Sequence, residues 1–425
     1  MKTFLAALVL LVCMVTAGPL PAQKKEAIYD ESKVPSYTLP DPLVLMNRKP
    51  VKTPSDWIRL RRPEIHRLFS EYVYGITPHD TISVEYRPVK QNTLFLGGKA
   101  TLQETDLVFS DSVHRCSLRV LLIVPNNASQ PAPVFLGLNF EGNHTLHPSV
   151  EISLANLWDA QTGKPFQAGE KTRGMNASRW PVEKIIDRGY ALASCYYGDI
   201  DPDFDDGFGN GVHVLFSRER TDESWGSIGT WAWGLSRILD FLSTVPEIDP
   251  EKVAVMGHSR LGKAALWAGA SDERFALVIS NNSGCGGAAL FRRKFGETVE
   301  HITTSFPHWF CKELSAYAQK EELLPVDQHM LISLIAPRPV YVASAEEDLW
   351  ADPKGEFLST VHAQKVYELL GREVFRNTDL PEVNKPINGL ISYHLRTGKH
   401  DITLYDWEQY LRFADLFLRE SNEWK

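Results

Sequence analysis

Five short segments of continuous apolar residues constrain the fold of this chain more than any other feature of its sequence. Strands that are buried on both faces of a parallel sheet have such runs, whereas strands with one exposed face alternate apolar and polar residues. Residues 228–242 and 404–418 instead carry apolar side chains at helical spacing. We therefore predict an α/β protein, a three-layer sandwich with a mostly parallel central sheet and its site at the carboxyl ends of the strands. The five segments are residues 134–138, 190–195, 252–256, 276–280 and 340–344.

The rest of the pattern predicts an antiparallel edge and long loops. Residues 81–86 and 116–124 alternate apolar and polar side chains, which is typical of antiparallel strands at one end of a sheet. Residues 140–180 and 200–225 have no such period and are rich in Asn, Asp, Gly and aromatic residues. We expect them to form loop insertions over the active edge of the sheet, with a composition that suits carbohydrate contact as well as plain irregular loops.

The first residues have the pattern of a secretory signal peptide. Lys2 precedes an apolar core at residues 4–15 and then small residues and prolines, which predicts cleavage near Ala22. Cys13 could indicate a lipoprotein, but the preceding Val12 is larger than such processing prefers. No later segment is apolar enough to span a bilayer, so we expect a secreted or periplasmic protein that has no membrane partner after signal removal. The expected division is a signal peptide at 1–22, an N-terminal extension at 23–40 and a single, monomeric domain at 41–425.

Composition argues against several classes of partner. With 43 % apolar residues the chain can bury a large core. Its formal net charge is −8 and it has no basic run, so nucleic acid is not an expected partner. Its cysteines form no Cys-x-x-Cys pair near histidines, so we expect no structural zinc site. Cys285 and Cys311 could form a disulfide in an oxidising compartment or remain free buried thiols.

Ser259 lies where a predicted strand passes through a turn of small residues into a predicted helix, at residues 253–263. A serine on such a sharp turn projects its hydroxyl above the sheet edge, beside the free N–H groups that begin the helix. Those groups can stabilise the oxyanion of an acyl transfer, so the pattern predicts a nucleophile. Gly257 and Gly262 give Gly-x-Ser-x-x-Gly, one residue longer than the common Gly-x-Ser-x-Gly. The alternative is that Ser259 only caps the helix.

A histidine and several acids follow in the order of an α/β-hydrolase triad, with the acid after a late strand and the histidine before the last helix. His400 directly precedes the predicted C-terminal helix and is the candidate general base, whereas His394 lies in a strand-like run and is a weaker candidate. Asp348 is the preferred acid because it lies a few residues past a strand end, and Glu347 is the second choice. The other acids of this loop are expected to be solvated or to lie at a helix N-terminus, and they are Glu346 and Asp352.

Six stretches carry a specific set of motifs, including the pair Ser259-Arg260 and a lysine four residues after the serine. They are residues 257–263, 281–288, 295–297, 306–310, 331–339 and 350–357. Together they resemble the bacterial glucuronoyl esterases of carbohydrate esterase family 15, with a likeness that runs from about residue 40 to the C-terminus. The resemblance implies an α/β-hydrolase that cleaves the ester between 4-O-methyl-D-glucuronic acid of glucuronoxylan and lignin alcohols, without a metal or an organic cofactor.

The resemblance also implies roles for individual residues. Ser259 corresponds to the nucleophile, His400 to the base and Arg260 to a side chain that binds the oxyanion. The residues expected to hold the hydroxyls and ring face of the uronate are Lys263, Glu297 and Trp350. Each of these three also has a plain alternative, namely a surface cation, half of a surface ion pair and a core aromatic residue, respectively.

Two departures from the family pattern bear on activity. Many members carry a glutamate at the position of Asn282 and use it as the triad acid, and an amide cannot carry that charge. The role of triad acid therefore falls to a residue of the later loop, which favours Asp348. Whether activity is reduced stays open. His258 and Asp401 stand where fungal relatives join two cysteines. Two alternatives to a glucuronoyl esterase stay open: an acetyl or other carbohydrate esterase on the same fold, and a weakly active carbohydrate-binding relative.

Overall fold

The computed structural model describes residues 26–79, 82–128, 131–216 and 219–419. The predicted signal peptide at 1–22 lies outside these residues, and the boundary expected near residue 41 stays a prediction. Among the helices in the described ranges, none is long and apolar enough to cross a membrane.

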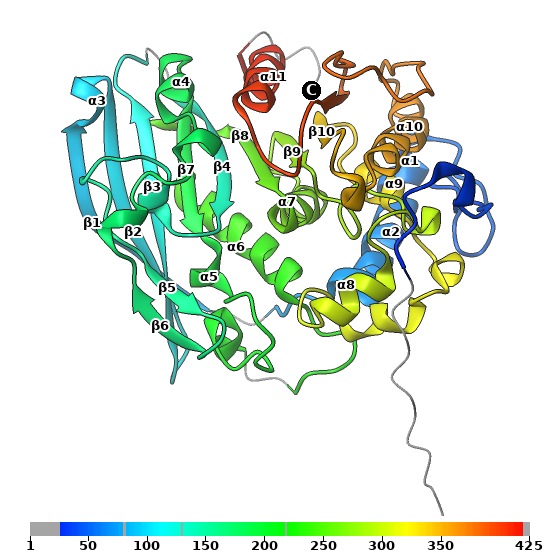
Figure 1. Cartoon of the computed structure of the whole chain (residues 1–425), viewed down its shortest axis with the longest axis horizontal. Helices are drawn as coiled ribbons and strands as arrows, with labels where there is room; N and C mark the ends of the chain where they lie inside the picture. Colours follow the sequence, from blue (N-terminus) through cyan, green and yellow to red (C-terminus); the bar gives the residue numbers. More distant parts are fainter. Residues whose placement is uncertain (1–25, 80–81, 129–130, 217–218, 420–425) are drawn as a thin grey trace, which may run out of the picture.

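The predicted central sheet is present, and nine of its strands lie in the described part of the chain (Figure 1). In spatial order they are β1 (Ser83–Leu94), β2 (Ala100–Ser110), β3 (Arg115–Pro125), β7 (Ala191–Tyr196), β4 (Ala132–Asn139), β8 (Ile248–His258), β9 (Leu277–Asn281), β10 (Val340–Ala345) and β11 (Ile391–Arg396). The strands from β7 to β11 in this order are parallel, and β1, β2 and β3 form an antiparallel edge. The predictions of a mostly parallel sheet and of an antiparallel edge are both confirmed. They could be made because strands buried on two faces and strands buried on one face have different sequence patterns.

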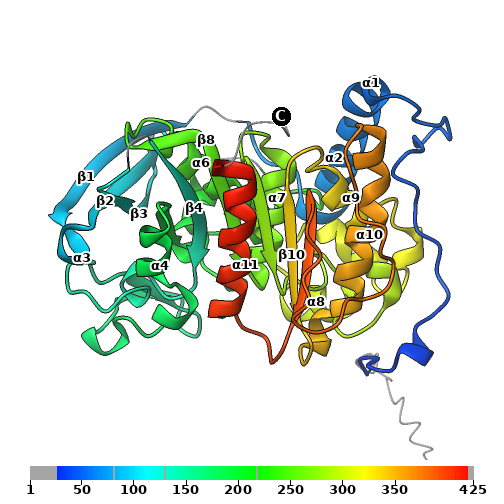
Figure 2. The same ribbon diagram turned by 90° about the horizontal axis from the view of Figure 1, so that it is seen from above.

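Helices cover both faces of the sheet, which makes the three layers of an α/β-hydrolase (Figure 2). In β8, Val253 and Val255 join the hydrophobic cluster of one face, and Ala254 and Met256 join that of the other. The first face carries α2 (Arg62–Phe69), α6 (Ser227–Leu242), α7 (Arg260–Ser271), α9 (Gln328–Ser333) and α10 (Pro353–Leu369), and the second carries α4 (Val182–Asp187) and α11 (Leu404–Ala414). The helices predicted at 228–242 and 404–418 are therefore α6 and α11, the latter continued by a π-helical turn.

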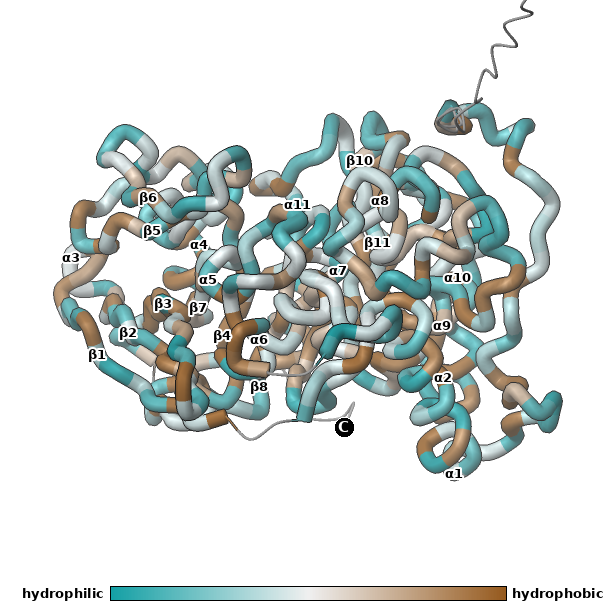
Figure 3. The backbone as a smooth tube through the Cα atoms, turned by 90° about the horizontal axis from the view of Figure 1, so that it is seen from below, coloured by the Kyte–Doolittle hydropathy of each residue, from teal (hydrophilic) through white to brown (hydrophobic). Residues whose placement is uncertain are grey.

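The connections contain short elements that the sequence pattern did not reveal. Residues 140–180 include a two-stranded hairpin of β5 (Asn156–Asp159) and β6 (Lys164–Gln167), so the prediction of loops throughout is wrong there. These strands are too short to show a period. In Figure 3, the tube is coloured as hydrophobic residues along β4 and around α9, and many of the outer loops are coloured as hydrophilic residues. The remaining short helices are α1 (Pro54–Asp56), α3 (Phe95–Gly98), α5 (Tyr197–Ile200) and α8 (Val299–Ser305).

The topology brings four distant segments to one edge of the sheet. Strands β8, β9, β10 and β11 are neighbours and run parallel, so the residues that follow them meet at their carboxyl ends. These strands lead directly to Ser259, to Asn282, to the loop of Asp348 and to the loop of His400.

Candidate active site

Ser259 occupies a strained turn between β8 and α7. Its backbone has φ 58° and ψ −128°, a conformation that non-glycine residues rarely adopt. A Cβ atom on Gly257 would lie 2.0 Å from the carbonyl oxygen of Leu261, and one on Gly262 would lie 3.0 Å from that of Gly257. The two glycines therefore allow the strand and the helix to approach each other, which explains their spacing around the serine. The N–H of Ser259 donates to the carbonyl of Asn281 at 2.9 Å and ties the turn to β9.

His400 contacts the preferred acid of the sequence analysis. Its Nδ1 lies 2.6 Å from Oδ2 of Asp348, which is buried, whereas Glu347 is exposed. This bond leaves Nε2 of the ring as the nitrogen that can act on a hydroxyl. The ring centroid of His400 is 4.6 Å from that of His258, the residue before the serine. The structure thus brings His400 and Asp348 together at the nucleophile turn.

Asn282 also holds Asp348. Its Nδ2 donates to Oδ2 of Asp348 at 2.9 Å, and its own backbone has a positive φ of 47°. Burial acts to raise the pKa of Asp348, but the hydrogen bond and charge of His400 and the amide of Asn282 hold that pKa below its usual value. The carboxylate is therefore ionised at neutral pH. Sequence reasoning treated Asn282 only as a lost acid and missed its role as a donor.

Arg260 is fixed by an aspartate that sequence reasoning missed. Its guanidinium is hydrogen-bonded to Asp203 and lies 5.0 Å from the ring centre of Trp309. Asp203 also accepts hydrogen bonds from His308 at 2.8 Å and from the indole of Trp309 at 2.6 Å. Burial acts to raise the pKa of Asp203, but His308, Arg260 and Trp309 together lower it to about 2. Among the described residues, the buried Nε of Arg260 has no hydrogen-bond partner.

The three predicted sugar contacts lie close to one another. Lys263 is buried on α7 and donates to the carbonyl of Ser283 at 2.5 Å, with its ammonium 3.9 Å from Glu297. Burial raises the pKa of Glu297 and outweighs the opposing charge of Lys263. The N–H of Glu297 donates to the carbonyl of Trp350 at 2.9 Å, and Trp350 is 43 % exposed. Lys263 is therefore not a surface cation, nor Trp350 a core residue.

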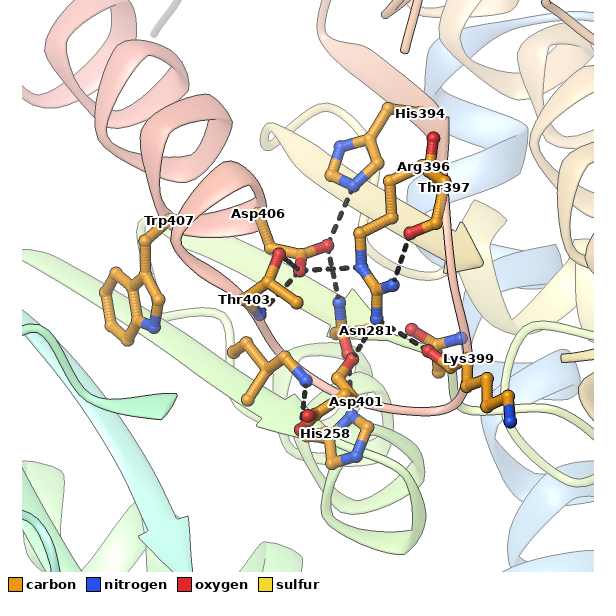
Figure 4. Close-up of polar contacts among 12 residues, drawn as sticks. His258, Asn281, His394, Arg396, Thr397, Lys399, Asp401, Thr403, Asp406 and Trp407 are labelled. Atoms are coloured by element: carbon orange, nitrogen blue, oxygen red, sulfur yellow. Dashed lines mark hydrogen bonds and ion pairs between the residues drawn. The ribbon is translucent and has the colours of Figure 1, made fainter. Parts of the chain in front are cut away.

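His394 has a structural environment of its own. It is buried, and one ring nitrogen contacts Asp406 at 2.9 Å (Figure 4). The other ring nitrogen lies 3.0 Å from the hydroxyl of Tyr341. Asp352, another acid of the loop, caps α10 and pairs with Arg293. These contacts occupy both residues in the fold.

The described cysteines are free thiols. Cys285 and Cys311 are buried free thiols and form no disulfide with each other. Within the described ranges, no three His, Cys, Asp or Glu residues are grouped so that they could hold a metal ion.

Comparison with known proteins places this chain in a family. A family model described as glucuronyl esterase of fungi matches residues 210–371. The chain is 47 % identical over 422 residues to carbohydrate esterase MZ0003 from an unknown prokaryotic organism. The matched region covers 96 % of this chain and 97 % of that protein.

Two solved structures agree. A promiscuous esterase of carbohydrate esterase family 15 from a marine bacterial metagenome has a TM-score of 0.86 at 47 % identity, over 92 % of this chain and 100 % of that one. The glucuronoyl esterase from Solibacter usitatus has a TM-score of 0.87 at 44 % identity, over 90 % of this chain and 99 % of that one. The chain therefore belongs to the glucuronoyl esterases of carbohydrate esterase family 15 and is a carboxylic ester hydrolase.

Proposed function

We propose that the protein hydrolyses the ester between 4-O-methyl-D-glucuronic acid of glucuronoxylan and lignin alcohols, with Ser259, His400 and Asp348 as its triad. The observation that carries the choice of substrate is the buried cation of Lys263, one helical turn after Ser259 and beside Glu297. A charged donor and a carboxyl at this place can bind the hydroxyls of a uronate. An acetyl ester has no sugar acid that would need them.

In the proposed reaction, Ser259 attacks the ester carbonyl while His400 accepts its proton. Asp348 accepts a hydrogen bond from Nδ1 of His400, which directs Nε2 toward the serine and stabilises the imidazolium that forms. Negative charge builds on the carbonyl oxygen, and the partly exposed guanidinium of Arg260 and the N–H groups at the start of α7 can bind it. His400 then protonates the leaving alcohol. Water, activated by the same imidazole, hydrolyses the acyl-enzyme and releases the uronic acid.

The pairing of Arg260 with Asp203 supports its role at the oxyanion. A guanidinium that is fixed before substrate binds does not have to reorganise when the charge appears, which is the condition for strong transition-state stabilisation. The exposed indole of Trp350 beside Glu297 offers an apolar surface for the face of a sugar ring. We also propose that the protein is exported by the signal at 1–22 and acts as a monomer.

Turnover of benzyl glucuronate and of an acetyl ester by the same preparation tests this proposal. We expect hydrolysis of the glucuronate ester to dominate, and Ser259→Ala to reduce its kcat by several orders of magnitude with the fold retained. A preference for the acetyl ester would favour the alternative esterase. The acetyl ester has to be assayed because one similar protein is described as a promiscuous esterase. Ser259→Ala with a tenth or more of the wild-type rate would contradict the triad. Binding of xylan without turnover of either ester would indicate a carbohydrate-binding relative.

A further inference from the structure

The position of the loop that carries His400 matters for the proposed reaction. His400 lies between β11 and α11, and 42 % of its side chain is exposed. A general base acts only within hydrogen-bond reach of the proton that it accepts, and a displacement of about 1 Å can reduce a rate about 100-fold. Its bond to Asp348 fixes one ring nitrogen but does not fix the backbone.

A single buried guanidinium binds this backbone on both sides of His400 (Figure 4). Arg396, the last residue of β11, donates from Nη2 to the carbonyls of Lys399 at 3.0 Å and Asp401 at 2.5 Å. Its Nη1 donates to the carbonyl of Thr397 at 2.9 Å. Three carbonyls of the loop therefore converge on one side chain. The rigid fork of a guanidinium can make such a set of bonds, which the ammonium of a lysine cannot reproduce.

Asp406 holds this guanidinium from the first turn of α11. Its Oδ2 accepts from Nε of Arg396 at 2.8 Å and from the N–H and hydroxyl of Thr403 at 2.7 Å each. Its Oδ1 accepts from His394 at 2.9 Å and from the amide of Asn281 at 3.1 Å. The side chain of Arg396 is 3 % exposed and that of Asp406 is 0 % exposed. The pair is therefore fully enclosed and its geometry is fixed by many partners.

Asn281 extends this network to the nucleophile turn. Its Nδ2 donates to Asp406 and also to the hydroxyl of Tyr410 at 2.8 Å, which uses both of its hydrogens. Its Oδ1 must then accept from Nδ1 of His258 at 2.6 Å, and the ring of His258 packs against that of His400. The backbone carbonyl of Asn281 accepts the N–H of Ser259. The same network thus contacts both the serine turn and the histidine loop.

We propose that Arg396, held by Asp406, is a positioning residue that sets the distance between His400 and Ser259. It does not touch the substrate or the reacting atoms, and the inference rests on the proposed role of His400 as the base. A buried ion pair with only a structural role would affect the free energy of unfolding and leave the kinetics of folded protein unchanged. A positioning role predicts a loss of kcat in protein that is fully folded.

The test compares two identical changes on opposite sides of the loop. Arg396→Lys keeps the charge opposite Asp406 but loses the fork that binds the three carbonyls. Arg179→Lys is the matched control, because Arg179 pairs with the side chain of Asp401 from the partly exposed outer side of the loop. We expect kcat on benzyl glucuronate to fall about 100-fold in Arg396→Lys with KM within about twofold, and to change by less than about threefold in Arg179→Lys.

A second readout separates positioning from folding. Combined with Asp348→Asn, Arg396→Lys should cost much less than it does alone, because both changes act through the placement of one imidazole. If Arg396→Lys does not fold, Arg396→Gln with Asp406→Asn replaces it, since removing both charges leaves no buried charge unpaired. An unchanged kcat in folded protein, or fully additive effects, would overturn the inference. Full activity of His400→Asn would instead contradict the proposed function itself.

Discussion

Asn282 and His400 donate to the same oxygen of Asp348, at 2.9 Å and 2.6 Å. The amide at position 282 therefore supports the acid of the later loop instead of replacing it. A carboxylate at 282, as in many family members, would lie against Asp348, and two such groups at hydrogen-bond distance cannot both ionise easily. The Asn282 and Asp348 pair thus carries one charge, on the side chain that follows β10 and not on the one that follows β9.

We expect the two positions to be exchangeable in part. Asp348→Asn should reduce kcat about 10⁴-fold, because the imidazolium of His400 then has no carboxylate beside it. Adding Asn282→Glu should recover about tenfold or more of that loss, since the longer side chain can bring a carboxylate to the same ring nitrogen. Asn282→Gln in the same background is the control for size. Kinetics on a glucuronate ester measure all three, and equal rates for the Glu and Gln variants would contradict the exchange.

The second choice of acid gives a separate prediction. Glu347 is exposed, and Nδ1 of His400 is already bonded to Asp348. Glu347→Gln should therefore change kcat by less than about threefold, against the loss of about 10⁴ for Asp348→Asn. If the two variants rank in the opposite order, Glu347 is the triad acid.

The sequence predicted those parts of the molecule in which burial leaves a local pattern. The five apolar runs became strands β4, β7, β8, β9 and β10, and the turn at Ser259 was visible from the glycines around it. The order of Ser259, Asp348 and His400 then indicated a candidate site at one edge of the sheet, because the ends of parallel strands meet there.

Contacts between distant non-periodic segments could not be predicted in this way. Asp203 lies in an irregular loop, and nothing in its local sequence marks it as the partner of Arg260 rather than its acidic neighbours. In the sequence, Asp406 resembles an ordinary acid in the first turn of a helix, and its bond to Thr403 is indeed a helix cap. Its contacts with Arg396 and Asn281 depend on the packing of three elements.

Arg260 provides a prediction about mechanism. If the proposed contact with the carbonyl oxygen forms mostly in the transition state, Arg260→Ala should lower kcat with little change in KM, by about 2.7 to 4 kcal/mol of transition-state stabilisation. Asp203→Asn should lower kcat less than Arg260→Ala. It removes the charge that pairs with the guanidinium, but the protein still has the guanidinium itself. Steady-state kinetics on a glucuronate ester decide this. An unchanged kcat in Arg260→Ala would reduce Arg260 to a structural or substrate-anchoring residue.

Lys263 should behave differently from Arg260. We expect it to bind the sugar in the ground state and the transition state alike, so its loss should mainly raise KM. Lys263→Met is the sharper variant, because it retains the buried stem of the side chain and removes only the ammonium beside Glu297. A fall in kcat with KM unchanged would assign Lys263 to the chemical step instead.

The buried carboxyl of Glu356 predicts how stability depends on pH. Glu356 lies on α10 with 0 % exposure and accepts hydrogen bonds from Ser344 at 2.6 Å and from the N–H of Gly284 at 2.9 Å. Burial raises its pKa to about 7, above the value of about 4.3 for an unfolded chain. Between these values the folded state holds a proton that the unfolded state has lost. The contribution of Glu356 to the free energy of unfolding is therefore complete below about pH 4, and it is lost as pH rises through 7.

Glu356→Gln should remove this dependence. The free energy of unfolding of the wild type should fall relative to that of the variant by up to about 3 kcal/mol between pH 4.5 and pH 8, which is the linkage value for a shift of this size. Denaturant titrations at several pH values measure it, and the difference between the two proteins cancels the opposite trend of buried histidines such as His329, whose pKa burial lowers to about 3. Glu347→Gln, at an exposed position, is the matched control for the exchange of a glutamate for a glutamine. Parallel profiles for the wild type and Glu356→Gln would show that the pKa of Glu356 is the same in the folded and unfolded protein, against the prediction.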